Sequence, residues 1–125
     1  MKNKKKLGIW MDHSHALLME IKDDVIIEEK IESEFTREEK EWSLTKNENL
    51  MHHKEQQMQS SFYKKLGDII KNYQEVMLFG STEAKSELLN KLKADHLFEE
   101  IKIELKHVDK MTENQRHSFV KEYFK

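Results

Sequence analysis

The stretch that decides the fold is Val-Met-Leu-Phe-Gly-Ser-Thr-Glu-Ala-Lys-Ser-Glu-Leu-Leu, residues 76–89. Its first four residues form an unbroken apolar run that ends at Gly80, which is typical of a central strand buried on both faces. Ser81 is a favourable N-cap, and Glu83 follows in the first turn, where the helix dipole favours an anion. The helix after it is expected to bury one apolar stripe, made of Ala84, Leu88, Leu89 and Leu92.

Three strands are predicted before this stretch. The segments 6–12 and 15–22 are short and apolar, with turn-forming residues between them. The segment 25–35 alternates with period two, so it is expected to be a half-buried antiparallel strand. Its predicted inner face carries Val25, Ile27, Ile31 and Phe35. From about residue 36 to residue 53 the pattern is lost, and a long surface loop is expected.

Helices and one more strand complete the predicted order. Residues 54–73 form an amphipathic helix with a stripe of Phe62, Leu66, Ile69, Ile70 and Tyr73. Residues 99–107 alternate as a strand, and Thr112 with Gln115 matches a capping box that opens the last helix. The order βββαβαβα predicts an α/β, three-layer, ribonuclease-H-like fold with a mixed five-stranded sheet. Residues 1–125 are expected to form a single domain.

Composition excludes several classes of protein. The chain has 125 residues and a formal net charge of -2, so it is not a strongly cationic nucleic-acid wrapper. It has no cysteine, which excludes disulfides, thiolate zinc sites and iron–sulfur clusters. No apolar run is long enough to span a membrane, and a secretory signal is not found. We therefore expect a cytoplasmic protein with no membrane partner and no cofactor.

The segment from Gln56 to Leu92 resembles the central domain of the archaeal and eukaryotic class-1 peptide release factors and of their relative Pelota. In that family a buried strand ends in a small-residue turn, and a helix carrying Phe-Lys-x-Glu-Leu follows. Phe79-Gly80-Ser81 matches the turn, and the run from Ala84 to Leu88 matches the helix. The resemblance implies a ribonuclease-H-like fold in a stand-alone, bacterial-type release-factor-like protein, without the flanking domains of a release factor.

The release chemistry of that family depends on a Gly-Gly-Gln tripeptide, which this chain does not contain. Aligning on Phe62 places Gln57 over the catalytic glutamine, and Glu55 and Gln56 over the two glycines. A carboxylate at position 55 would be unfavourable beside a developing negative charge. Pelota also lacks the tripeptide. The resemblance therefore implies a translation-associated module that binds the ribosome or tRNA without catalysis.

Basic and amide side chains of the long helix are the predicted RNA-binding residues. They are Lys54, Gln56, Gln57, Lys64, Lys65 and Lys71. Lys64 and Lys71 lie on similar helix faces because they are seven residues apart. Phosphate contacts by such lysines would make binding sensitive to salt. The alternative is that these lysines only solvate the polar face of an amphipathic helix.

A metal-dependent nuclease is an alternative function, with Asp12, Glu55 and Glu113 as its carboxylates. Ribonuclease-H-like nucleases place a carboxylate at the end of the first strand, where Asp12 lies. Two-metal chemistry needs several converging carboxylates. The expected acid at the end of the central strand is absent, because Gly80 and Ser81 occupy that position. Asp12 has a structural alternative, which is to cap the turn through Ser14.

Two further alternatives concern metal binding and self-association. His13, His15 and His52 are weak candidates for a metal site, but they match no zinc signature of known spacing. A homo-oligomeric protein-interaction module is also considered, in which an apolar patch near Ile101 pairs with a second copy.

Overall fold

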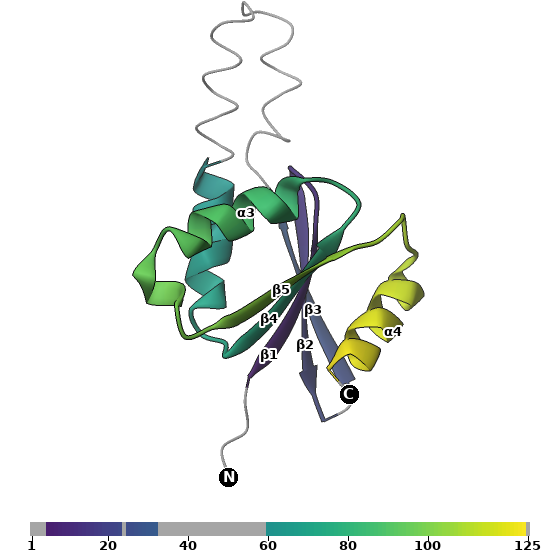
Figure 1. Cartoon of the computed structure of the whole chain (residues 1–125). Helices are drawn as coiled ribbons and strands as arrows, with labels where there is room; N and C mark the ends of the chain where they lie inside the picture. The colour runs from purple at the N-terminus through teal and green to yellow at the C-terminus, as the bar shows by residue number, and fades with distance from the viewer. Residues whose placement is uncertain (1–4, 24, 33–59, 125) are drawn as a thin grey trace, which may run out of the picture.

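The computed structural model describes residues 5–23, 25–32 and 60–124. Five strands form one mixed sheet in the spatial order β3-β2-β1-β4-β5 (Figure 1). The first three strands form an antiparallel meander, whereas β4 pairs in parallel with both β1 and β5. The α/β class and the mixed five-stranded sheet are as predicted. The strands are β1 (Lys6–Met11), β2 (His15–Lys22), β3 (Val25–Glu32), β4 (Glu75–Gly80) and β5 (Lys102–His107).

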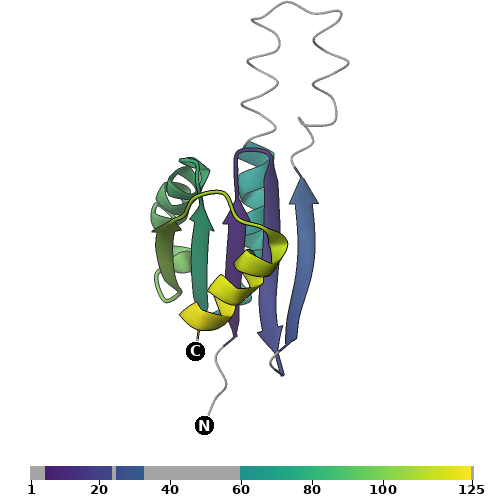
Figure 2. The same cartoon turned by 90° about the vertical axis from the view of Figure 1, so that its right-hand side faces the viewer.

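Helices cover both faces of the sheet, which gives three layers (Figures 1 and 2). The helix over residues 60–70 and α3 (Ala84–Lys93) lie on one face, and α4 (Glu113–Tyr123) lies on the other. A short 3-10 helix, η1 (His96–Phe98), follows α3. This 3-10 helix occupies part of the connection to β5. For that reason β5 begins at Lys102, three residues later than the predicted start at residue 99.

Two hydrophobic cores lie on opposite sides of the sheet, and alternate residues of β4 fill both. Val76 and Leu78 pack in the larger core under the helix over residues 60–70 and α3. Met77 and Phe79 pack in the smaller core under α4. All four side chains are fully buried. The prediction that this apolar run forms a strand buried on both faces is confirmed.

α4 lies directly on the sheet because β1 carries a glycine where the helix crosses it. A Cβ at Gly8 would lie 2.7 Å from Cγ2 of Val120, which is the fully buried residue of the helix. The predicted capping box at the helix start is confirmed. Thr112 Oγ1 accepts from the backbone N–H of Gln115 at 3.2 Å, and Gln115 Oε1 accepts from that of Thr112 at 2.9 Å.

The predicted inner face of β3 is corrected by the structure. Val25 and Ile27 are 60% and 52% exposed, and only Ile31 packs against the larger core. The physical reason is that β3 is an edge strand, so the helical layer reaches one end of it and leaves the other uncovered. The predicted continuation to Phe35, and the loop expected up to residue 53, lie outside the described residues.

The predicted N-cap at Ser81 is also corrected. α3 begins at Ala84, and its N-cap is Glu83, which makes no side-chain capping bond. Thr82 Oγ1 instead accepts a hydrogen bond from the backbone N–H of Ala84 at 3.3 Å. Gly80 explains the longer connection, because it has a φ of +155° and a Cβ there would collide with the carbonyl oxygen of Met11.

The start of β1 lies close to the last described residue, Phe124. The Lys6 ammonium is 5.9 Å from the centre of the Phe124 ring, so the start of β1 and the residue after α4 are neighbours. Among the described helices, none combines the length and the apolar character needed to cross a bilayer.

Candidate nucleic-acid interface

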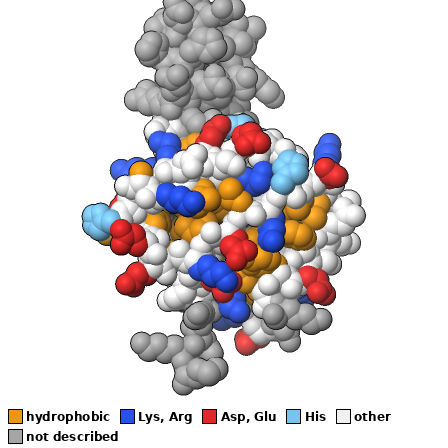
Figure 3. All heavy atoms as spheres, in the orientation of Figure 1, with side chains coloured by type: hydrophobic (Ala, Val, Ile, Leu, Met, Phe, Trp, Pro, Cys, Tyr) orange, Lys and Arg blue, Asp and Glu red, His pale blue; other side chains and the backbone are white. Residues whose placement is uncertain are grey.

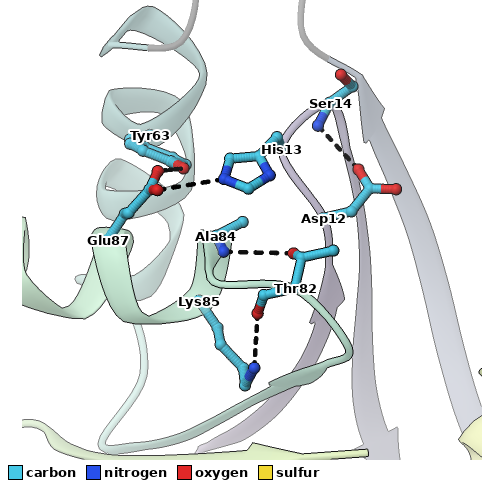
Figure 4. A network of polar contacts seen from close by, with 8 residues as sticks. All are labelled: Asp12, His13, Ser14, Tyr63, Thr82, Ala84, Lys85 and Glu87. Carbon is cyan, nitrogen blue, oxygen red and sulfur yellow. Dashed lines mark hydrogen bonds and ion pairs between the residues drawn. The ribbon is translucent and has the colours of Figure 1, made fainter. Parts of the chain in front are cut away.

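Polar side chains gather where two neighbouring parallel strands end. β1 and β4 are paired in parallel, so their carboxyl ends lie at the same edge of the sheet. In open α/β sheets this edge is the usual place for a ligand site. Figure 4 shows Asp12 and His13 after β1, Thr82 after β4, and Lys85 and Glu87 on α3. Two residues of the predicted sites, Asp12 and His13, therefore lie at this edge.

The Asp12 carboxylate holds the turn between β1 and β2. Its Oδ1 accepts hydrogen bonds from the backbone N–H groups of Ser14 at 2.8 Å and His15 at 2.7 Å. This is the structural alternative expected for Asp12, with His15 added as a second donor. Glu113 lies at the start of α4, and Glu55 lies outside the described residues. Because Glu55 is one of the three nuclease carboxylates, the set as a whole is not described, and the nuclease stays a prediction.

The candidate metal histidines contact different carboxylates. His13 Nε2 lies 3.2 Å from Glu87 Oε2, whereas His15 Nδ1 lies 3.3 Å from Asp12 Oδ1. His52 lies outside the described residues. Within the described part of the chain, the one group of three metal-ligating side chains with close ligand atoms lies elsewhere, at Glu28, Glu113 and His117.

Glu87 links the helix over residues 60–70 to the turn after β1. Tyr63 donates a hydrogen bond from its hydroxyl to Glu87 Oε1 at 2.7 Å, and the other carboxylate oxygen faces His13 (Figure 4). Burial raises the pKa of Glu87, but the hydrogen bonds from Tyr63 and His13 outweigh it, and the net pKa is lowered. Burial, followed by the bond to Glu87, raises the pKa of Tyr63. Glu87 is thus held as an anion and Tyr63 as a neutral donor.

Lys85 is a buried lysine that was not among the predicted site residues. Only 4% of it is exposed, and its ammonium donates to the carbonyl oxygen of Thr82 at 2.6 Å and lies 3.4 Å from His107 Nδ1. A signal was present, because Lys85 precedes Leu88, Leu89 and Leu92 at the spacing of one helical stripe. Lys85 therefore fixes the β4–α3 connection and is not available to a ligand.

Three lysines line a groove between the helix over residues 60–70 and α3. Its volume is about 350 Å³. Lys64 and Lys71 were predicted as RNA-binding residues, and both line it, together with Lys91 from α3. Two acidic residues, Asp68 and Asp95, lie among them. The full lining is Ser60, Tyr63, Lys64, Gly67, Asp68, Lys71, Lys91, Leu92, Asp95 and Phe98.

Two of the three groove lysines make weak, exposed contacts. Lys91 Nζ donates to Ser60 Oγ at 3.4 Å, and Lys71 Nζ lies 3.5 Å from Asp68 Oδ1. The Lys71 ammonium also lies 5.8 Å from the centre of the Phe98 ring. Exposed ion pairs of this kind contribute little, so a phosphate can replace them at small cost. On the face of the molecule that Figure 3 shows, basic and acidic side chains are interspersed around apolar atoms, without a patch of a single charge sign.

The remaining predicted RNA-binding residues lie elsewhere. Lys65 is exposed on the helix over residues 60–70 but does not line the groove. Lys54, Gln56 and Gln57 lie outside the described residues. Lys91 was not predicted, because nothing in the sequence places a residue of α3 beside a helix that ends more than ten residues before it.

Comparison with solved structures shows which known domain has this fold. Archaeoglobus fulgidus Pelota matches with a TM-score of 0.62 and 10% identity over 97% of this chain. Thermoplasma acidophilum Pelota matches with a TM-score of 0.61 and 11% identity over 94% of it. The fold is that of a Pelota and release-factor domain. The archaeal translation termination factor aRF1 also matches, with a TM-score of 0.53 and 15% identity over 96% of the chain.

The similarity covers part of each relative and is structural only. This chain spans 32% of each Pelota chain and 39% of the aRF1 chain. No family model matches the sequence, and no curated protein matches it. The resemblance seen in the sequence is thereby confirmed at the level of the fold, at identities too low to transfer an activity.

Proposed function

We propose that this protein is a translation-associated module that binds the ribosome or tRNA and does not catalyse hydrolysis. The observation that supports the proposal most is the groove lined by Lys64, Lys71 and Lys91, which lies on a fold shared with Pelota and aRF1. Such a role would place the protein in the cytoplasm. Ester hydrolysis of the release-factor kind is not proposed, because the chain contains no Gly-Gly-Gln sequence.

The groove supplies charge and shape for a phosphate backbone. Its three lysines come from the helix over residues 60–70, the turn after it and α3, so their ammonium groups can follow a nucleic-acid strand that runs between them. Asp68 and Asp95 limit the net charge of the groove, which favours a weak contact. Each phosphate that a lysine neutralises would make this contact sensitive to salt. The whole chain has a net charge of -2, so binding must come from this local arrangement rather than from an overall attraction.

The proposal is tested by measuring tRNA binding and co-sedimentation with ribosomes over a series of salt concentrations. A triple variant, Lys64→Gln, Lys71→Gln and Lys91→Gln, removes the groove charges. The matched control, Lys22→Gln, Lys110→Gln and Lys121→Gln, removes the same charge from residues outside the groove. The groove variant should bind more weakly, and its slope of log affinity against log salt should be shallower by about two, at about 0.7 for each lost phosphate contact.

Two outcomes would contradict the proposal. One is a wild-type protein that binds neither ribosomes nor tRNA at low salt. The other is an equal loss of affinity in the groove variant and the control, because it would show that only the overall charge matters. Circular dichroism of both variants checks that the fold is retained.

Self-association stays a separate prediction. Ile101 is partly buried and packs against the larger core, and β5 beside it is an edge strand of the sheet. Light scattering over a concentration series distinguishes a monomer from an assembly formed through this edge.

A further inference from the structure

A second group of side chains lies on the α4 side of the sheet, away from the basic groove. Glu113 and His117 are four residues apart on α4, which places them one turn apart on the same helix face. Glu28 faces them from β3. The three side chains each offer one ligand atom, and these atoms all lie within 4.8 Å of one another. Two elements far apart in the sequence thus bring two carboxylates and an imidazole together.

The charges of this group are only partly balanced. Glu28 Oε1 lies 2.6 Å from His117 Nε2, but Glu113 makes no hydrogen bond or ion pair with another described residue. Arg116, on the same turn of α4, is engaged elsewhere: it donates to the carbonyl oxygen of Met111 and lies over the Trp10 ring. The α4 dipole stabilises Glu113 in part. With a neutral imidazole the group carries two negative charges, which is the charge a divalent cation neutralises.

We propose that Glu28, Glu113 and His117 bind a divalent transition-metal ion, with zinc as the expected ion. Carboxylate oxygen and imidazole nitrogen are common zinc ligands, and three protein ligands leave a fourth position for water. Zinc–ligand distances of about 2.0–2.2 Å separate neighbouring ligand atoms by about 3.3 Å or more. The Glu28–His117 contact must therefore lengthen when the ion enters. Both side chains have room to do so, since they are 24% and 31% exposed.

The structural consequence of the ion would be a link between the sheet edge and α4. Glu28 belongs to the edge strand β3, whereas the other two ligands belong to α4. An ion that binds the folded chain and not the unfolded chain stabilises the fold by mass action. Zinc should therefore raise the thermal midpoint of this protein.

The test uses the full chain, freed of metal with a chelator, and zinc alone as the probe. Calorimetric titration should give one ion per chain, and thermal unfolding should shift upward with added zinc. Glu113→Gln is the decisive variant, because it leaves the Glu28–His117 contact intact. Without metal it should unfold slightly below the wild-type temperature, because the helix dipole loses its anion. It should bind zinc roughly tenfold or more weakly and lose the upward shift that zinc gives the wild type. His117→Gln should weaken binding as well, whereas His96→Gln, at an exposed histidine on η1, should not.

The proposal is overturned by two results. One is a metal-free wild-type protein that binds no zinc. The other is a Glu113→Gln variant that binds zinc as tightly as the wild type, because the ion would then lie at other residues, such as His13 and His15. Neither result bears on RNA binding by the groove, so this proposal and the proposed function fail independently.

Discussion

Glu87 is the residue whose charge the fold determines most clearly. Its two carboxylate oxygens face different partners, the Tyr63 hydroxyl at 2.7 Å and His13 Nε2 at 3.2 Å. Because these contacts lower its pKa below the ordinary 4.5, the carboxylate form is favoured by folding. The stabilisation is fully present above about pH 4.5 and is lost as the pH falls through the lower pKa of the folded state.

Replacing Tyr63 by phenylalanine should therefore destabilise the protein in a pH-dependent way. Tyr63 is 3% exposed, but the Glu87 side chain is 49% exposed, so solvent weakens the bond. We expect a loss of about 1 kcal/mol at pH 7, below the range for a buried bond to a charged group. Urea unfolding at pH 7 and at pH 3.5 measures it. A difference between variant and wild type that stays the same at both pH values would contradict the role assigned to the Glu87 charge.

At the scale of elements, the position of α4 depends on one pair of residues, Gly8 on β1 and Val120 on the helix. A Cβ at position 8 would lie 2.7 Å from Val120 Cγ2, closer than a real Cβ contact. Gly8→Ala should therefore push the helix away from the sheet and destabilise the fold by about 1–3 kcal/mol. Val120→Ala should cost about 2 kcal/mol, because it leaves a cavity at a fully buried position.

The double variant decides whether this contact positions the helix. The alanine at position 120 removes the methyl groups that the new Cβ would strike, so the two losses should sum to more than the loss in the double variant. Urea unfolding of the four proteins completes the cycle. Strict additivity would show that the two residues do not meet.

Elements with strong local patterns were predictable from the sequence. The apolar run of β4 and the Thr112–Gln115 capping box are signals carried by a few adjacent residues, and both are confirmed. The predicted inner face of β3 was wrong because alternation with period two indicates a strand but does not reveal how much of that strand a helix covers. Ser81 failed as an N-cap because the φ of +155° at Gly80 turns the chain before the helix begins.

The candidate sites were less predictable because their residues come from distant segments. Lys64 and Lys71 were found through their spacing on one helix, whereas Lys91 reaches the groove from another element. Glu28 and His117 are separated by 89 positions, and only the packing of α4 on the sheet brings them to 2.6 Å. Glu113 was considered for a different reason, as a nuclease carboxylate.

At the scale of the whole molecule, all three tyrosines share one electrostatic property. Each is partly or fully buried beside a carboxylate, and each has a raised pKa. For Tyr73, burial, the hydrogen bond to Glu20 and the charges of Glu20 and Glu29 raise the pKa to about 12. The unfolded chain therefore loses these protons near pH 10, before the folded chain does.

Stability should accordingly fall as the pH rises above about 10. Each tyrosine contributes a loss of up to about 1.4 kcal/mol per pH unit until its folded pKa is reached. Tyrosinate absorbance, measured beside circular dichroism in an alkaline titration, tests this. The absorbance should rise with the loss of structure and not before it. Tyrosines that ionise near pH 10 in a protein that is still folded would contradict the expectation.

The closeness of Lys6 to Phe124 has a consequence for how the chain can be rearranged. A short linker would be enough to join residue 6 to residue 124, so a circularly permuted protein can be opened in the turn at Asp23, between β2 and β3, with the sheet intact. The same closeness would allow this domain to be inserted into a loop of a larger protein without distorting either fold, because the two connections would lie side by side.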